Sequence, residues 1–361
     1  MKLTDFDHFK AREPYYTGYR LLSTPDKNGD KPEIFISTSN RSAGKTVFYS
    51  GYMLHRYIQN NEKFLLLYRN KYETETAVQN FASQIIDLFY AGVELTQERG
   101  IKNVYDKITI KAGDSAPEIC GYVTSLRASE QIKKYSSMLS GVSWILFDEA
   151  FPEDDIYLPD EVRRLMSIHD SLARGGGAQN RYLPVIIIGN LINVDNPYYS
   201  ALNIVDQLTI ETNYMRGDGW VVEQAFNAAS AQAHAQSAFH RALDRVGYGA
   251  ASMEKTYLNT DYQFIENQIV DKGIYICSIK YGKHLYSVRY NENTDFYYAG
   301  TNPDPSCKYV QAATEADIDD NAIYDPLSRA RKLLKKKFRD NKVRFKNLET
   351  RSAVLHFING R

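Results

Sequence analysis

Two motifs, each at the end of a strand-like segment, most constrain what this 361-residue chain can fold into. The first is a loop that follows the strand-like residues 33–36 and opens a helix-like segment; it consists of Ser39, Asn40, Arg41, Ser42, Ala43, Gly44, Lys45 and Thr46. Backbone N–H groups and a helix N-terminus converge at such a loop, which is typical of a triphosphate site. The pattern predicts that ATP binds here, with Lys45 at its β- and γ-phosphates and Thr46 on Mg²⁺.

The second motif is the apolar run 144–147, which ends in Asp148 and Glu149. A run of this kind is the form of a buried parallel strand, and its C-terminal tip would hold Asp148 near the metal and Glu149 near the attacking water. About a hundred residues separate the two motifs, which leaves room for further strands and helices between them. Together the motifs predict an NTPase, although Ser39 stands where a phosphate loop normally starts with glycine.

Composition sets the outer bounds of the interpretation. A chain of this length exceeds the size at which a single core usually keeps growing, so we expect two domains. The 44 basic and 44 acidic residues balance, so any nucleic-acid contact must come from a local patch. Three cysteines far apart argue against a zinc site or a disulfide framework and suit a reducing cytoplasm. The apolar runs are strand-sized, so we expect no membrane span.

The first two hundred residues alternate between strand-like and helix-like segments. Residues 34–36, 64–68 and 184–190 are apolar strands, residues 47–59 and 74–90 have helical periodicity, and residues 107–123 form a hairpin before the acidic strand. This order predicts an α/β domain with a mostly parallel sheet. Ligands gather at the C-terminal ends of such strands, where both motifs and Asn190 fall.

The character of the chain changes after the apolar strand that ends at Asn190. We predict an ATPase domain over residues 1–205, a helical linker over residues 206–250 and a C-terminal domain over residues 251–361. Strand-like segments between 273 and 299 form a meander. Residues 326–346 then hold ten basic side chains against one acid, and we expect this segment to bind a nucleic-acid phosphate backbone. The residues chosen for that contact are Lys335, Lys336, Lys337 and Arg339; a solvated amphipathic helix is the alternative.

Residues 39–46, 142–149, 157–162 and 190–198 together resemble one known family. It is the encapsidation protein, the DNA-packaging ATPase of small protein-primed podophages of the Bacillus type, a relative of phage terminase large subunits. The resemblance implies a P-loop NTPase domain of the ASCE, RecA-like class, followed by a smaller α+β domain with a vestigial RNase H-like nuclease fold. It implies a homomeric ring, pentameric in the well-known members, that pulls double-stranded DNA through a portal into a procapsid.

The resemblance also assigns roles and partners. Glu149 matches the catalytic base, Asp148 the metal ligand, Asn190 the strand-end sensor and Arg174 an arginine finger donated by the neighbouring subunit, with Arg181 as its rival. The implied partners are double-stranded DNA, the portal, a packaging RNA and further copies of the chain. The implied location is the host cytoplasm, with transient binding to the procapsid and absence from the mature virion.

Two alternative functions remain open at this point. One is a terminase large subunit with a working nuclease, but the first strand of the meander, residues 274–279, carries no carboxylate for two-metal chemistry. The remaining candidates, Asp271, Glu292, Asp295 and Asp304, lie in expected turns, so we expect a domain that has lost its metals. The other alternative is a ring that binds nucleotide only to assemble a scaffold on the portal.

Overall fold

The computed structural model describes most of the chain in two compact units. The described residues are 16–139, 141–152, 156–174, 180–190, 194, 196–205, 207–208, 212–238, 266, 273–303 and 310–359. The first unit contains the described residues up to 190 together with 212–238. The second unit contains those between 194 and 208 together with the described residues from 266 onward.

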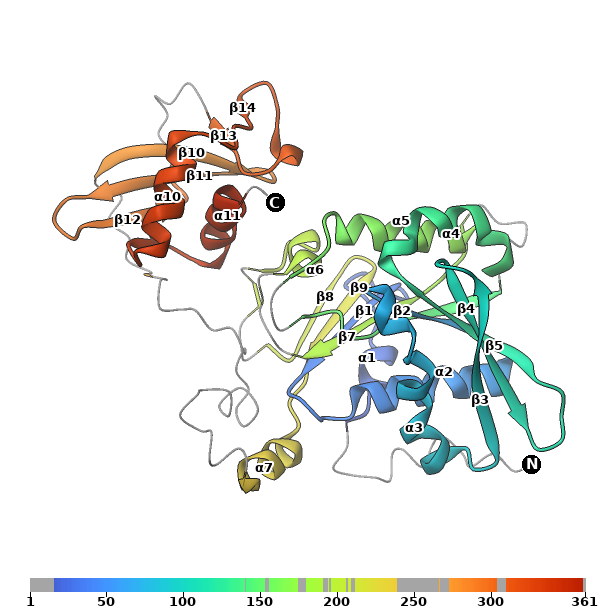
Figure 1. Ribbon diagram of the computed structural model, residues 1–361. Coiled ribbons are helices and arrows are strands. Elements are labelled where there is room, and N and C mark those ends of the chain that lie inside the picture. The colour runs from blue at the N-terminus through green and yellow to red at the C-terminus, as the bar shows by residue number, and fades with distance from the viewer. Residues whose placement is uncertain are drawn as a thin grey trace. The chain divides into compact units, whose positions relative to one another are not determined.

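A nine-stranded, mostly parallel sheet forms the centre of the first unit (Figure 1). Six parallel strands lie in the order β5-β2-β6-β7-β1-β9, and antiparallel strands extend both edges, β4 and β3 beyond β5 and β8 beyond β9. This confirms the α/β class that the alternating pattern predicts. The strands are β1 (Ile34–Ser39), β2 (Lys63–Tyr68), β3 (Val93–Ile101), β4 (Tyr105–Ala112), β5 (Glu118–Ser125), β6 (Val142–Phe147), β7 (Val185–Asn190), β8 (Tyr214–Gly217) and β9 (Trp220–Gln224).

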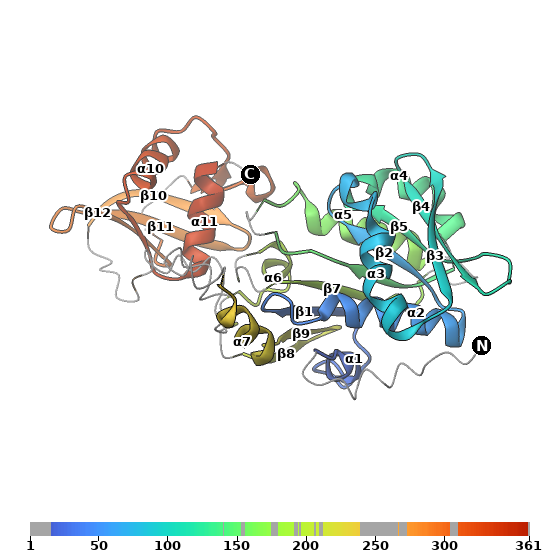
Figure 2. The same cartoon turned by 60° about the horizontal axis from the view of Figure 1, so that its bottom comes forward.

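Helices cover both faces of this sheet, so most residues of its central strands β2, β6 and β7 are apolar and buried. Figures 1 and 2 show α2 and α3 against one face and α4 and α5 against the other. Phe64 and Leu66 of β2 belong to the core under α2 and α3, which also contains Phe48 and Phe81. The helices are α1 (Tyr19–Ser23), α2 (Lys45–Asn60), α3 (Ala77–Phe89), α4 (Ser129–Tyr135), α5 (Glu161–Ala173) and α7 (Ala228–Gln236), with short 3₁₀ turns η2 (Lys71–Thr74), η3 (Leu126–Ala128) and η4 (Ser136–Leu139).

The sheet of the first unit continues beyond residue 205, which corrects the predicted domain boundary. Residues 214–224 form the hairpin β8–β9 instead of a helical linker, and β9 pairs with β1 in parallel. The sequence pattern does not predict β9, because its last two residues, Glu223 and Gln224, are polar although they are buried. Within the predicted linker, the helix described in full is α7, residues 228–236. Strand β3, which turns the predicted hairpin into a three-stranded meander, was also unanticipated; its side chains are largely exposed or half-buried.

The second unit contains a six-stranded sheet in the order β14-β13-β10-β11-β12-β15. The three strands β10–β12 form the predicted meander and pair antiparallel; β13 lies parallel beside β10, and β14 lies parallel beside β13. Leu334 of α10 and Phe357 of α11 share one core with these strands. The elements are α6 (Pro197–Ala201), β10 (Ile274–Tyr281), β11 (His284–Asn291), β12 (Phe296–Gly300), β13 (Val310–Ala312), η7 (Glu315–Asp317), β14 (Ala322–Ile323), α10 (Arg329–Arg339), β15 (Val343–Phe345) and α11 (Leu348–Asn359). No described helix in either unit has the length and apolar character needed to cross a membrane.

Candidate nucleotide site

The predicted phosphate loop connects the C-terminal end of β1 to the N-terminus of α2. Two of its residues have positive φ angles, Gly44 at 103° and Ser42 at 58°. Glycine adopts such a conformation without strain, whereas serine adopts it against the contact between its Cβ and the backbone. Lys45, the first residue of α2, is buried, and its Nζ donates a hydrogen bond to the hydroxyl of Ser39. The loop therefore has the local geometry that the sequence predicts, with one strained position.

The acidic end of β6 meets the start of α2. The hydroxyl of Thr46 lies 3.4 Å from Oδ1 of Asp148, although a hundred residues separate them in sequence. Burial and the neighbouring Glu149 raise the pKa of Asp148 to about 7, while burial lowers the pKa of Lys45 to about 8. Both shifts indicate charged groups that lack enough compensating charge or solvent. A hydroxyl and a carboxylate are oxygen ligands of the kind Mg²⁺ prefers, and a buried ammonium fits a phosphate, so the residues present suit a magnesium-bound triphosphate.

Glu149 and Asn190 lie at the same edge of the sheet. Glu149 is exposed, has a φ of 51°, and its backbone N–H donates to Oδ1 of Asp148 at 2.8 Å. Asn190 ends β7, the strand between β6 and β1, and pairs in register with Ser39 at the start of the phosphate loop. The sheet order thus brings the predicted base and the predicted sensor to the edge that carries the loop.

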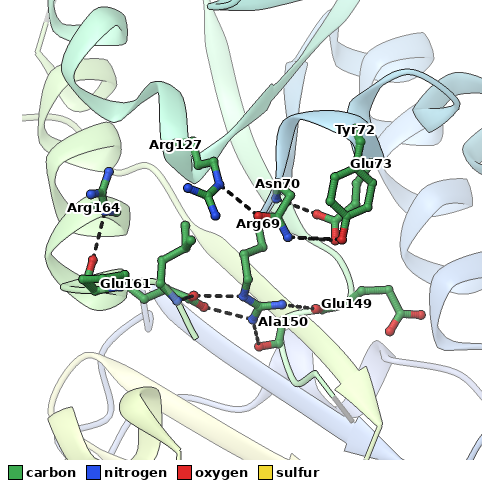
Figure 3. A network of polar contacts seen from close by, with 11 residues as sticks. Arg69, Asn70, Tyr72, Glu73, Arg127, Glu149, Ala150, Glu161 and Arg164 are labelled. Carbon is green, nitrogen blue, oxygen red and sulfur yellow. Dashed lines mark hydrogen bonds and ion pairs between the residues drawn. The ribbon is translucent and has the colours of Figure 1, made fainter. Parts of the chain in front are cut away.

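A buried arginine that the sequence analysis did not identify supports the turn at Glu149 (Figure 3). Arg69 directly follows β2 and donates to the carbonyl oxygens of Glu149 at 3.2 Å and Ala150 at 2.6 Å. Its guanidinium also forms a two-point ion pair with Glu161 at 2.9 and 3.0 Å. Glu161 begins α5, and its carboxylate accepts the N–H of Leu158 at 2.8 Å. Arg69 therefore fixes the strained turn of Glu149 to the first residue of α5.

The two rival arginines for the predicted trans contact differ in their surroundings. Arg174 follows the last residue of α5, is exposed, and precedes residues 175–179, which lie outside the described part of the chain. Arg181 is half-buried, and its guanidinium donates to the carbonyl oxygens of Val142 and Leu172, the latter at 3.0 Å. The guanidinium of Arg181 is therefore already hydrogen-bonded to backbone carbonyl oxygens of its own subunit.

A model of the podovirus DNA encapsidation protein family (Gp16) matches residues 15–359. The chain belongs to this family. A DNA packaging protein of Bacillus phage B103 is 24% identical over 285 residues, which are 78% of this chain and 82% of that protein. Two solved structures share the fold. One, from the viral genome packaging motor assembly of bacteriophage Phi-29, has a TM-score of 0.65 at 22% identity and covers 96% of this chain and 99% of its own. The other, the Phi-28 gp11 DNA packaging motor, has a TM-score of 0.61 at 17% identity and covers 96% and 98%.

Membership of the encapsidation family confirms the resemblance stated from the motifs, and with it the DNA-packaging function. It does not favour the two alternatives, a terminase with a working nuclease and a non-hydrolysing scaffold. Of the four carboxylates that the nuclease alternative could use, Glu292 and Asp295 lie within the described residues. Asp295 accepts hydrogen bonds from Tyr290 at 2.9 Å and Lys342 at 3.0 Å, and Asp271 and Asp304 lie outside the described residues. Among the described residues, no three His, Cys, Asp or Glu side chains cluster as a metal site would require.

Residues 329–339 of the basic segment form the amphipathic helix α10. Leu334 and Arg331 face inward, and the Arg331 guanidinium donates to the carbonyl oxygens of Ala312 and Phe357, so this arginine has a structural role. The four predicted contact residues lie on the same helix. Lys335, Lys336 and Arg339 are exposed, whereas Lys337 is half-buried with its Nζ 5.6 Å from the ring centroid of Tyr297.

Breaking the Arg69–Glu161 pair tests whether the Glu149 turn depends on it. Both side chains are buried, so Arg69→Ala leaves an uncompensated carboxylate, and we expect the free energy of unfolding to fall by about 3–5 kcal/mol. Lys133→Ala is the matched control, because Lys133 and its partner Glu130 are 48% and 72% exposed, and it should change stability by less than about 0.5 kcal/mol. Denaturant titration of both variants measures the difference. Equal losses would contradict a specific role for Arg69.

Proposed function

We propose that this encapsidation protein is an ATP-driven motor subunit that translocates double-stranded viral DNA into a procapsid as part of a homomeric ring. The observation that carries the proposal is the contact between Thr46 and Asp148, which joins the phosphate loop to the acidic strand. In this proposal Lys45 and the loop N–H groups hold ATP, and Thr46 and Asp148 hold Mg²⁺. Bound Mg²⁺ would neutralise charge on the phosphates during transfer to water.

Glu149 is the proposed catalytic base. Its exposed carboxylate lies one residue beyond the metal ligand, and the two bonds from Arg69 to this turn fix its backbone. A carboxylate in this position would orient the attacking water and accept its proton. Asn190, at the neighbouring strand end, is the proposed sensor of the γ-phosphate because it pairs in register with Ser39.

Glu149→Gln tests the proposed base. The amide is isosteric but cannot accept a proton, so we expect ATP hydrolysis to fall by roughly two to four orders of magnitude while binding of an ATP analogue persists. Glu94→Gln, at an exposed position of β3, is the control and should hydrolyse ATP at the wild-type rate. Steady-state phosphate release and analogue titration supply the two readouts. Unchanged turnover in Glu149→Gln would refute the assignment, and a wild-type protein that binds ATP without releasing phosphate would favour the scaffold.

Arg174 is the proposed finger that a neighbouring subunit contributes. It is exposed at the end of α5, whereas Arg181 is engaged with its own backbone carbonyls. An arginine delivered from a neighbour would stabilise charge on the γ-phosphate, so hydrolysis would require an assembled ring. Helix α5 starts at Glu161, which Arg69 ties to the Glu149 turn, so this helix would connect a subunit's own base to the finger that it offers.

Mixing two inactive variants tests whether Arg174 acts in trans. Arg174→Ala subunits keep their own loop, and Lys45→Ala subunits keep their arginine, so mixed rings contain complete sites and we expect partial recovery of ATPase activity. A mixture of Glu149→Gln with Lys45→Ala is the control. Each of these variants lacks a residue that its own subunit must supply to its site, so no mixed ring contains a complete site and no recovery is expected. No recovery in the first mixture would show that Arg174 acts in cis or not at all.

The second unit is the proposed vestigial RNase H-like domain, and α10 its nucleic-acid contact. An antiparallel meander with two parallel strands beside its first strand supports the fold assignment, and the absence of a carboxylate from β10 supports the loss of cleavage. Lys335, Lys336 and Arg339 present positive charge to solvent and would displace counterions from phosphates. The further proposed partners are the portal and a packaging RNA, and the proposed location is the host cytoplasm and the procapsid, not the mature virion.

Removing the exposed charges of α10 should weaken DNA binding in a salt-dependent way. In the triple variant Lys335→Ala, Lys336→Ala and Arg339→Ala, we expect the slope of log affinity against log salt to shrink by about 2 to 3. The control is Lys27→Ala, Lys102→Ala and Lys283→Ala, which removes the same charge from exposed positions elsewhere. Equilibrium binding to duplex DNA, and in parallel to duplex RNA, gives the slopes. Equal slopes for both triple variants would remove α10 from the interface.

A further inference from the structure

Residues 225–230, between the end of β9 and the first turn of α7, form hydrogen bonds to the phosphate loop. Strand β9 runs parallel to β1, so its end lies beside the start of the loop, and the N–H of Ala225 still donates to the carbonyl of Thr38 at 2.7 Å. The next residues turn into α7, the last described helix of this unit before the strands of the second unit begin. The segment between β9 and α7 is therefore hydrogen-bonded to the residue directly before the phosphate loop.

Two side chains link the loop to the start of α7. The amide of Asn40 makes a two-point contact with the backbone of Asn227: its Nδ2 donates to the carbonyl at 3.1 Å, and its Oδ1 accepts the N–H at 2.8 Å. The hydroxyl of Ser230 donates to the carbonyl of Arg41 at 2.7 Å. The side chain of Asn227 in turn accepts the N–H of Ser230 at 2.8 Å, which caps α7. Asn40 is only 5% exposed, so its amide faces α7 and is not free for a ligand.

These contacts flank the strained residue of the loop. Ser42 has a φ of 58° where a glycine would be at ease, and a non-glycine residue keeps such a conformation only where its surroundings over-determine it. The hydrogen bonds from Asn40 to Asn227 and from Ser230 to Arg41 fix the two residues immediately before Ser42.

We propose that Asn40 and Ser230 are positioning residues that hold Ser42 in the left-handed conformation needed for triphosphate binding, so that nucleotide affinity depends on α7. The inference rests on the proposed nucleotide site and goes beyond it. It reassigns the Asn40 side chain from ligand contact to loop support. It also makes α7, the last described helix of the first unit, a part of the phosphate site.

Affinity of the full-length protein for a slowly hydrolysed ATP analogue with Mg²⁺ tests the proposal. We expect Asn40→Ala, which loses two hydrogen bonds, to bind about tenfold more weakly and Ser230→Ala, which loses one, about threefold more weakly. Gln232→Ala, an exposed position on the same helix, should bind like the wild type. Thermal melts of each variant identify any that fail to fold.

The decisive arm adds Ser42→Gly to each variant. Glycine adopts the left-handed conformation without support, so it should restore affinity to within about twofold of wild type in both backgrounds. Failure of Ser42→Gly to rescue Asn40→Ala, together with normal binding by Ser230→Ala, would mean that Asn40 contacts the nucleotide directly and would overturn the inference. Wild-type affinity in both single variants would overturn it as well. A wild-type protein that binds no analogue would instead refute the proposed nucleotide site.

Discussion

The meeting of Thr46 and Asp148 is the contact on which the site depends. It joins the N-terminus of α2 to the tip of β6, and it exists because the parallel sheet places β7 alone between β6 and β1. The same arrangement brings Lys45 close to Asp148 and Glu149, whose negative charges favour its ammonium while burial opposes it. The buried ammonium would pair with the phosphates and the two carboxylates with a divalent metal, so the charges of this site complement those of a metal-bound triphosphate.

Two strained turns form this edge, and each is supported by a segment remote in sequence. Ser42 and Glu149 both have positive φ angles without being glycine. Hydrogen bonds to residues beside Ser42 come from the start of α7, and those to the turn at Glu149 come from Arg69. Strain of this kind persists only where neighbours impose it, so the turn at Ser42 depends on α7, and the turn at Glu149 depends on Arg69 and its ion pair with Glu161 at the start of α5.

The sequence predicts those parts of the fold whose signals are local. The succession of strand, loop and helix around residues 39–46, the apolar strands and the meander of the second unit follow from short patterns, and the structure confirms these elements. The hairpin β8–β9 was not predicted, because Glu223 places a buried carboxylate within a strand. Hydroxyl groups such as that of Ser37 on the neighbouring β1 stabilise this carboxylate. Asp218 and Gly219 between the two strands are a two-residue hairpin signal that would have revealed it.

The supporting residues of the site were beyond prediction for a related reason. Arg69 directly follows an apolar strand and so lies at the edge of the sheet where ligands bind, but its partner Glu161 is 92 residues away in sequence. Asn40 and Asn227 are likewise 187 residues apart. Pairings over such separations depend on strand order, which composition and periodicity do not determine. The proposed preference for Arg174 over Arg181 also rests on the structure, because Arg174 is exposed whereas Arg181 is half-buried and donates to backbone carbonyl oxygens.

A structure of the assembled protein with Mg²⁺ and a slowly hydrolysed ATP analogue measures the central claim directly. The account predicts the β- and γ-phosphates within hydrogen-bonding distance of Lys45 Nζ, and a metal ion bound by the Thr46 hydroxyl with Asp148 beside it. Nucleotide bound elsewhere, or Asp148 and Glu149 turned away from the phosphates, would contradict it.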